Sequence, residues 1–317
     1  MAASITGVAW QMIKGRTPML RRTTIFIPGT MDEAAIRSRI SSCGADLICL
    51  DLEDTVHPSR KAEARELIVR LLAEDIWGRA ARAVRINAMS GDFAEDDVRT
   101  VVGQAGQFID TLLLSKPETV EEILRLDSWI EEIRADKGFA NQIGYIVGIE
   151  SAYALTNIDT LASCSPNVEA LGFAIGDLSV SLHVNIGAYL QDRSKYPGDL
   201  FHFHRARIIL SARTYGLWAM DAPWPIINDH ATLSEDARWG MMMGFDGKLV
   251  LAPEQVRTVH EAYRPSEGEV AYARDVLVKM EAFNQAGEGS GMSGETFLDP
   301  VVIEPAKRTI ARFEAPL

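Results

Sequence analysis

The chain has 317 residues, 47% of them hydrophobic and 24% charged, which is the balance of a globular protein with one large core. Its 32 basic and 44 acidic residues give a formal net charge of −12, which argues against a nucleic-acid partner and against binding to an anionic membrane. No apolar run approaches the roughly 20 residues that a membrane-spanning helix needs. The three cysteines, Cys43, Cys49 and Cys164, lack CxxC spacing, so they predict a reducing cytoplasm rather than a disulfide framework or a zinc site.

Residues 1–23 are predicted to form a basic leader outside the fold. This stretch contains Lys14, Arg16, Arg21 and Arg22, and no acidic residue occurs before Asp32. A transit peptide is an alternative interpretation, although the stretch lacks the continuous apolar core of a secretory signal.

Short segments rich in β-branched and other apolar residues alternate with helical patterns between residues 24 and 264. This alternation predicts βαβ units, and eight such units favour a closed (β/α)8 TIM barrel of the α/β class over an open sheet. The expected strands are Ile25–Ile27, Leu47–Leu50, Ala83–Ile86, Thr111–Leu114, Tyr145–Ile149, Ala170–Phe173, Trp218–Met220 and Lys248–Leu251.

The intervening helices are expected to place an apolar stripe against the barrel. The first of them carries Ile36, Ile40 and Cys43 at helical spacing. The segments Thr30–Glu33 and Ser115–Glu118 fit the capping box, in which a hydroxyl and a glutamate three residues later bind backbone N–H groups, so helices are expected to begin there.

Residues 265–317 are predicted to form a C-terminal helix followed by a mobile cap. The helix is expected from Ser266 to about Phe283, and Phe297–Val302 is apolar enough to dock on another surface. A glycine-rich stretch between them favours a hinge. Its glycines are Gly287, Gly289, Gly291 and Gly294.

Polar residues follow six of the expected strands, at the end of the barrel where enzymes of this fold carry their functional groups. In strand order they are Asp51, Glu53 and Asp54; Arg85 and Asn87; Lys116; Glu150; Asp177; and Asp221. Mg²⁺ prefers oxygen ligands and usually takes one or two protein carboxylates. Glu150 and Asp177 are the best candidate ligands because they follow neighbouring strands, although either one alone would equally fit a helix cap.

Arg85 lies within an otherwise apolar strand, where a guanidinium group requires an anionic partner. Two roles stay open for it. One is an ion pair with the cluster formed by Asp51, Glu53 and Asp54, and the other is contact with a substrate carboxylate or a developing enolate oxygen.

Nine segments in a fixed order carry a resemblance to a known family. They are Ile25–Gly29, Gly44–Asp46, Asp51–Asp54, Arg85–Asn87, Lys116–Pro117, Gly148–Ser151, Gly176–Leu178, Gly244–Lys248 and Leu298–Val301. In these segments the chain resembles the citrate lyase β-subunit and malyl-CoA lyase family, a branch of the HpcH/HpaI aldolase–citrate lyase superfamily. The resemblance implies a carbon–carbon lyase that depends on Mg²⁺, with Mn²⁺ as an alternative. It also implies a substrate that is a short hydroxyacyl thioester such as malyl-CoA, citramalyl-CoA or citryl-CoA, split reversibly into a keto acid and an acyl thioester.

The resemblance also implies roles for single residues. Glu150 and Asp177 would bind the metal, Arg85 would polarise substrate oxygens, Asp51, Glu53 and Asp54 would orient metal-bound water, and Asp299 would reach a barrel mouth as an acid or base. Arg37 and Lys116 are expected to contact the thioester cofactor. A homotrimer or hexamer is expected, in which each tail covers the barrel of a neighbour.

The chain departs from the family pattern at three positions. Ala252 replaces a usual histidine, Ala34 replaces one of two basic residues that would meet the cofactor phosphates, and Ala174 replaces a usual glycine. Three alternatives therefore stay open. They are a class II pyruvate-type aldolase acting on free hydroxy-keto acids, a citrate lyase β-subunit acting on a carrier-bound thioester, and a non-catalytic relative that binds a metabolite.

Overall fold

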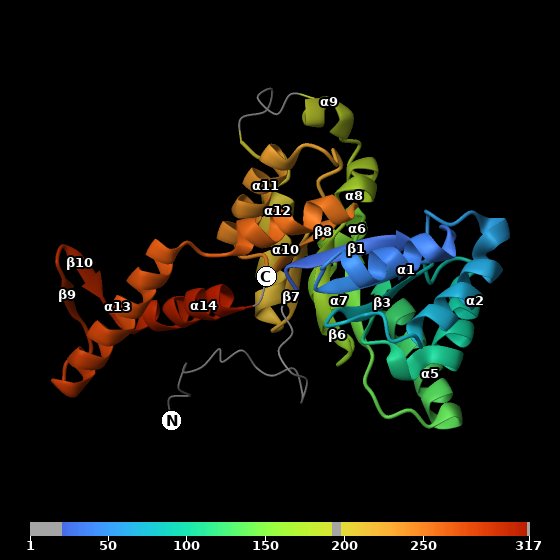
Figure 1. The fold of residues 1–317 in the computed structure, drawn as a ribbon, viewed down its shortest axis with the longest axis horizontal. Coiled ribbons are helices and arrows are strands. Elements are labelled where there is room, and N and C mark those ends of the chain that lie inside the picture. Colours follow the sequence, from blue (N-terminus) through green and yellow to red (C-terminus); the bar gives the residue numbers. More distant parts are fainter. Residues whose placement is uncertain (1–20, 192–197, 316–317) are drawn as a thin grey trace.

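The computed structural model describes residues 21–191 and 198–315, so most of the predicted leader, Lys14 and Arg16 included, lies outside the described residues. Eight parallel strands pair in chain order and close into a barrel, which confirms the predicted (β/α)8 architecture (Figure 1). The strands are β1 (Thr23–Pro28), β2 (Leu47–Asp51), β3 (Ala81–Ile86), β4 (Thr111–Leu114), β5 (Gly144–Ile149), β6 (Val168–Phe173), β7 (Trp218–Asp221) and β8 (Gly247–Val250). Each expected strand overlaps one of these, although Leu251 falls beyond the end of β8.

Helices surround the barrel in the described part of the chain. They are α1 (Glu33–Ser42), α2 (Lys61–Leu72), α3 (Ala94–Asp97), α4 (Gly103–Ala105), α5 (Val120–Lys137), α6 (Ala152–Thr156), α7 (Ile158–Ser163), α8 (Ile175–Ser181), α9 (Ile186–Gln191), α10 (His202–Thr214), α11 (His230–Met243) and α12 (Pro253–Tyr263), with short turns η1 (Pro58–Arg60), η2 (Val98–Val102) and η3 (Gly106–Phe108). None of the described helices is both long and apolar enough to cross a membrane.

The predicted apolar stripes are confirmed, but the predicted capping boxes are wrong. Ile36 and Ile40 of α1 are buried. The cap of α1 is Asp32, whose carboxylate accepts a hydrogen bond from the backbone N–H of Ala35 at 3.0 Å. The cap of α5 is Thr119, which forms its box with Glu122.

The helix α5 begins later than expected because of the backbone at Lys116. This residue has a φ of 52°, which is incompatible with a right-handed helix. It also precedes Pro117, and the residue before a proline avoids the helical region. The segment Ser115–Glu118 is therefore a loop at the carboxyl end of β4.

Asp221 was expected at the barrel rim, but the structure places it in a buried ionic network between the strands and the outer helices. Its carboxylate binds Lys248 Nζ at 2.9 Å and Arg205 Nε at 3.1 Å. The same two cations bind Asp236 of α11. Asp221 therefore joins β7 to α10 and β8. The candidate site is formed by residues at the ends of the other strands.

The C-terminal arm (residues 267–315) extends away from the barrel (Figure 1). It consists of α13 (Glu267–Gln285), a hairpin of β9 (Gly291–Ser293) and β10 (Thr296–Leu298), the turn η5 (Pro300–Val302) and α14 (Ile303–Glu314), which returns along α13. A small apolar core joins these elements and contains Ala273, Val276, Met280, Leu298 and Ala306. The predicted hinge glycines belong to this hairpin region. Gly287 and Gly294 take positive φ angles of 76° and 59°, and a Cβ at Gly291 would lie 2.3 Å from the ring of Phe283.

Candidate active site

Asp51 anchors an acidic loop at the carboxyl end of β2. Its side chain is fully buried and accepts hydrogen bonds from the backbone N–H of Glu53 at 2.9 Å and from the hydroxyl of Thr55 at 2.6 Å. A side chain that binds its own chain two and four residues later folds the loop tightly. The carboxylates of Asp51 and Glu53 both face Arg85.

Arg85 crosses from β3 to this loop. Its Nε and Nη2 donate to the two carboxylate oxygens of Asp51 at 2.7 and 2.5 Å, and Nη1 lies 3.3 Å from Glu53. The guanidinium carbon is 4.7 Å from the ring centroid of Phe26. Burial opposes the charge of Arg85, but the hydrogen bonds and charge of Asp51 outweigh burial and raise its pKa. The ion-pair alternative is therefore realised in the structure, while 17% of the side chain stays exposed.

Lys116 connects the acidic loop to the next strands. Its ammonium group lies 2.6 Å from Glu53, 2.6 Å from Asp54 and 3.8 Å from Asp177. Its backbone N–H donates to Glu150 at 3.0 Å. Partial burial opposes its charge, but the bonds to Asp54 and Glu53 prevail and raise the pKa of Lys116. One residue thus contacts four carboxylates.

Glu150 follows β5 directly and is 6% exposed. A Cβ at Gly148 would lie 2.5 Å from the Glu150 carboxylate, so glycine at that position makes room for it. Burial, opposed by the N–H of Lys116 and assisted by the charges of Asp177 and Glu53, raises the pKa of Glu150 to about 7. A buried carboxylate with other carboxylates near it is a site that a cation stabilises.

Asp177 lies in the first turn of α8, four residues beyond the end of β6, and half of its side chain is exposed. The structure places it close enough to Glu150 for its charge to help raise the pKa of that carboxyl. Asp177 does so from a helix rather than from the strand end.

The charges of this region fit a divalent cation. Five carboxylates, those of Asp51, Glu53, Asp54, Glu150 and Asp177, lie among three cations, Arg85, Lys116 and Lys61, which leaves a formal excess of two negative charges. Within the part of the chain that the structure describes, no three acidic, histidine or cysteine side chains converge on one metal position. A cation bound by Glu150 and Asp177 would therefore take its remaining ligands from water and substrate, which is usual for Mg²⁺.

A cavity of about 550 Å³ opens beside this cluster. Its volume falls in the range of pockets for small ligands. Acidic, basic, aromatic and small residues line it, among them Glu53, Asp54, His57, Lys61, Asn87, Phe93 and Lys116.

Lys61 is a residue of this region that the sequence did not reveal. Its buried ammonium group donates to the carbonyls of Leu52 and Glu53 at 2.6 and 2.9 Å and to Asn87 Oδ1 at 2.6 Å. It therefore fixes the backbone of the acidic loop. The sequence does contain a sign of its role. Lys61 is the first residue of α2, where the helix dipole disfavours a positive charge, so a lysine there indicates that its charge has a partner.

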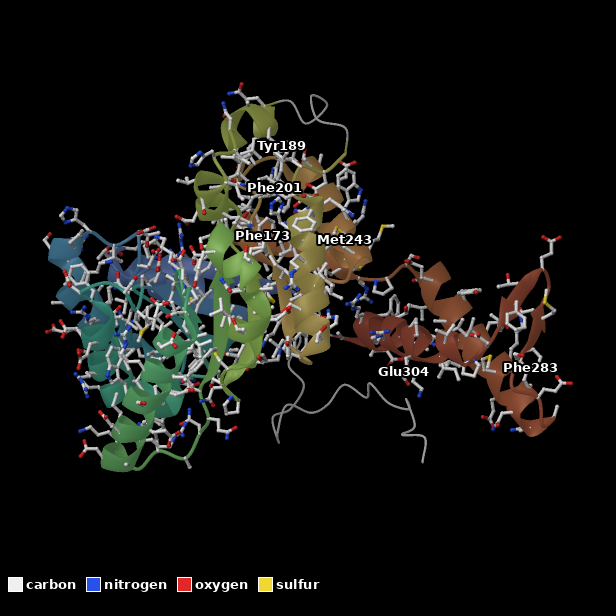
Figure 2. All side chains as sticks on the ribbon, turned by 180° about the vertical axis from the view of Figure 1, so that it is seen from behind. Phe173, Tyr189, Phe201, Met243, Phe283 and Glu304 are labelled. Atoms are coloured by element: carbon white, nitrogen blue, oxygen red, sulfur yellow. The ribbon has the colours of Figure 1, made fainter. Side chains whose placement is uncertain are left out.

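Two predicted site residues lie away from this cluster. Arg37 of α1 binds Glu74 at 2.7 Å and Glu33 at 2.5 Å. Asp299 follows β10 and caps η5, where its carboxylate accepts from the N–H of Val301 at 3.1 Å. Figure 2 shows Phe283, which packs on the hairpin, at the far end of the arm and well away from Phe173 of the barrel.

Comparisons with known proteins find related lyases and related structures. L-malyl-CoA/beta-methylmalyl-CoA lyase from Cereibacter sphaeroides is 30% identical over 302 residues, which cover 92% of this chain and 94% of that protein. Human mitochondrial citramalyl-CoA lyase is 28% identical over 315 residues, covering 98% of this chain and 90% of its own. A citrate lyase beta subunit from M. tuberculosis, solved with oxaloacetate and magnesium, superposes with a TM-score of 0.62 at 25% identity, covering 78% of this chain and 98% of that one. A model of the HpcH/HpaI aldolase/citrate lyase family matches residues 22–253, so the chain belongs to that family, as the resemblance in its sequence predicted.

Proposed function

We propose that the protein is a Mg²⁺-dependent carbon–carbon lyase that splits a short hydroxyacyl thioester, of the malyl-CoA or citramalyl-CoA type, into a keto acid and an acyl thioester. The observation that carries the proposal is the excess of negative charge around Glu150 and Asp177, next to the guanidinium of Arg85. The names of the relatives support a lyase acting on a coenzyme A thioester. The relatives differ in the acyl group that their names give, so the choice of a malyl or citramalyl group is a proposal.

Glu150 and Asp177 are the proposed metal ligands. A divalent cation held there would act as a Lewis acid that stabilises negative charge on substrate oxygens. Glu53 and Asp54 bind the same ammonium group of Lys116 that lies 3.8 Å from Asp177, and they would orient water. Asp51 would act through Arg85, whose guanidinium plane it fixes.

Arg85 would hold the substrate carboxylate or the enolate oxygen that forms when the carbon–carbon bond breaks. Its exposed fraction of 17% supports this role, and its Nη1 atom lies outside the bidentate pair with Asp51, at 3.3 Å from Glu53. A fixed donor at a developing charge stabilises the transition state more than the ground state.

Asp299 is proposed as the acid or base that exchanges a proton with the new methyl or methylene group, and it would do so in the site of a neighbouring chain. The arm that carries it points away from its own barrel (Figure 1), which supports a homotrimer or hexamer with shared sites. The arm also exposes the apolar residues Met292, Phe297 and Val301, at 59%, 60% and 75%, around Asp299. Exposed apolar clusters of this kind favour a contact with another surface.

Arg37 and Lys116 remain proposed contacts for the thioester cofactor. Lys116 lines the 550 Å³ cavity, which supports its part of the proposal. Arg37 is bound to two glutamates, so an anionic ligand would have to compete with them. The cytoplasmic location also stays a prediction, supported by three cysteines that are free in the structure.

The test is a mass-spectrometric screen of the purified protein with hydroxyacyl-CoA esters and free hydroxy acids, with Mg²⁺ and with a chelator. Cleavage of a thioester only when Mg²⁺ is present supports the proposal. Activity confined to free hydroxy-keto acids would instead identify an aldolase, and binding without any turnover would identify a non-catalytic relative.

The metal ligands have a separate test. Glu150→Ala and Asp177→Ala should each abolish Mg²⁺ binding in calorimetry, while circular dichroism shows an intact barrel. Asp136→Ala, which removes an exposed acidic residue of α5, is the control and should bind Mg²⁺ normally. Stoichiometric Mg²⁺ binding by both site variants would refute the assignment.

A further inference from the structure

Among the described residues, Lys116 is the one cation that pairs both with the acidic loop, at Glu53 and Asp54, and with Asp177. Its ammonium group binds Glu53 and Asp54, both at 2.6 Å, and lies 3.8 Å from Asp177. Its N–H binds Glu150. The chain places this residue there at a cost, since a φ of 52° is unfavourable for any residue with a Cβ.

A cation in this position must affect a second cation bound nearby. A divalent ion on Asp177 would share that carboxylate with the ammonium group of Lys116, and like charges at such distances repel. Lys116 is 34% exposed and Asp177 is 50% exposed, so water screens the repulsion without removing it.

We propose that Lys116 is a positioning residue that acts as an internal counter-ion: it gathers Glu53, Asp54 and Asp177 and, by its charge, weakens the binding of a divalent cation at Glu150 and Asp177. This inference rests on the proposed metal site and adds to it a residue that sets the metal affinity. Weak intrinsic affinity suits a site whose remaining ligands come from the substrate, because an anionic substrate supplies the negative charge that Lys116 offsets.

The sign of the effect separates this role from a purely structural one. A lysine that only held the loop in place would, when removed, leave a looser site that binds metal less well. A counter-ion, when removed, leaves a more negative site that binds metal more tightly.

The test compares three substitutions by calorimetric titration with Mg²⁺ alone. Lys116→Gln removes the charge and keeps the length, Lys116→Gly removes the charge and relieves the backbone strain while keeping the N–H to Glu150, and Lys116→Arg keeps the charge. We expect the two neutral variants to bind Mg²⁺ about tenfold more tightly than the wild type, and the arginine variant to bind within about twofold of it. Lys137→Gln is the matched control, because Lys137 pairs with Asp136 on the exposed surface of α5.

Thermal unfolding gives a second measurement that does not depend on activity. Because tighter binding stabilises the folded state more at a fixed metal concentration, Mg²⁺ should raise the Tm of Lys116→Gln by more than it raises that of the wild type. Unchanged or weaker Mg²⁺ binding in both neutral variants would overturn the inference. A wild-type protein that binds Mg²⁺ but cleaves no thioester would refute the proposed function and leave the role of Lys116 intact.

Discussion

Arg85 binds both oxygens of the fully buried Asp51 carboxylate, while its Nη1 lies 3.3 Å from Glu53. Lysine cannot reproduce this, since a single ammonium group cannot bind two oxygens in one plane and still offer a fixed donor to a ligand. The geometry therefore links the fold of the acidic loop to the proposed contact with substrate.

Two substitutions separate the role of Arg85 in stabilising the fold from its proposed role in contacting substrate. Arg85→Lys keeps the charge beside Asp51, so we expect the protein to fold and to bind Mg²⁺ while kcat falls about 100-fold or more. Arg85→Met leaves the buried charge of Asp51 without its bidentate ionic partner, and should lower the free energy of unfolding by about 3–5 kcal/mol in urea titrations. Arg99→Met, which removes an exposed pair with Glu95, should change it by less than about 0.5 kcal/mol. An Arg85→Lys variant with normal kcat would confine Arg85 to a structural role.

At the scale of elements, the strands were predictable because apolar, β-branched segments buried on both faces leave a clear pattern in the sequence. Helix faces were predictable for the same reason, as Ile36 and Ile40 show. The residues at which helices begin were less predictable. The sequence Ser115–Glu118 fits a cap by composition, yet the positive φ of Lys116 makes it a loop that enters the site.

The direction of side chains at strand ends was also hard to predict from the sequence. Glu150 and Asp221 both follow or end a strand, but one meets the acidic cluster and the other points to Arg205 and Lys248 between barrel and helices. Neighbouring residues of a strand face opposite sides, so a shift of one residue in a strand end reverses the prediction. The sequence does not define strand ends to that precision.

The helix α12 offers a test of local stability. Its N-cap is Ala252, which has extended backbone angles and no side chain able to bind the first N–H groups. We expect Ala252→Ser to raise the free energy of unfolding by about 1 kcal/mol, since the serine oxygen can accept from the first helical turn. Ala252→Cys is the control of similar size, because sulfur is a weak acceptor. Equal stability of both variants in urea would show that the cap is not limiting.

At the scale of the whole molecule, the arm holds a core of its own while exposing Phe297 and Val301 beside Asp299. The arm does not need the barrel to cover this surface if a second copy of the chain does so. The position of Asp299 then follows from assembly rather than from the fold of one chain.

Mixed oligomers test whether Asp299 acts in the site of a neighbouring chain. Arg85→Lys and Asp299→Asn chains, each nearly inactive alone, should recover activity when they are unfolded and refolded together. Random mixing in a closed ring, where each site pairs two chains, leaves about a quarter of the sites complete. No recovery, despite mixed oligomers seen by mass spectrometry, would place Asp299 in the site of its own chain or outside catalysis.

The direction in which the arm points has a kinetic consequence. An enzyme whose acid or base arrives on a neighbouring chain loses activity upon dilution, because separated chains keep the metal site but no longer have the proton donor. Specific activity should therefore rise with protein concentration and level off where the oligomer is complete, whereas Mg²⁺ binding should not change across the same range. A chain shortened before residue 291 would disable the neighbouring barrel that its arm covers, while its own barrel could still be completed by the arm of another chain, so in a mixed population the loss of activity would equal the fraction of shortened chains.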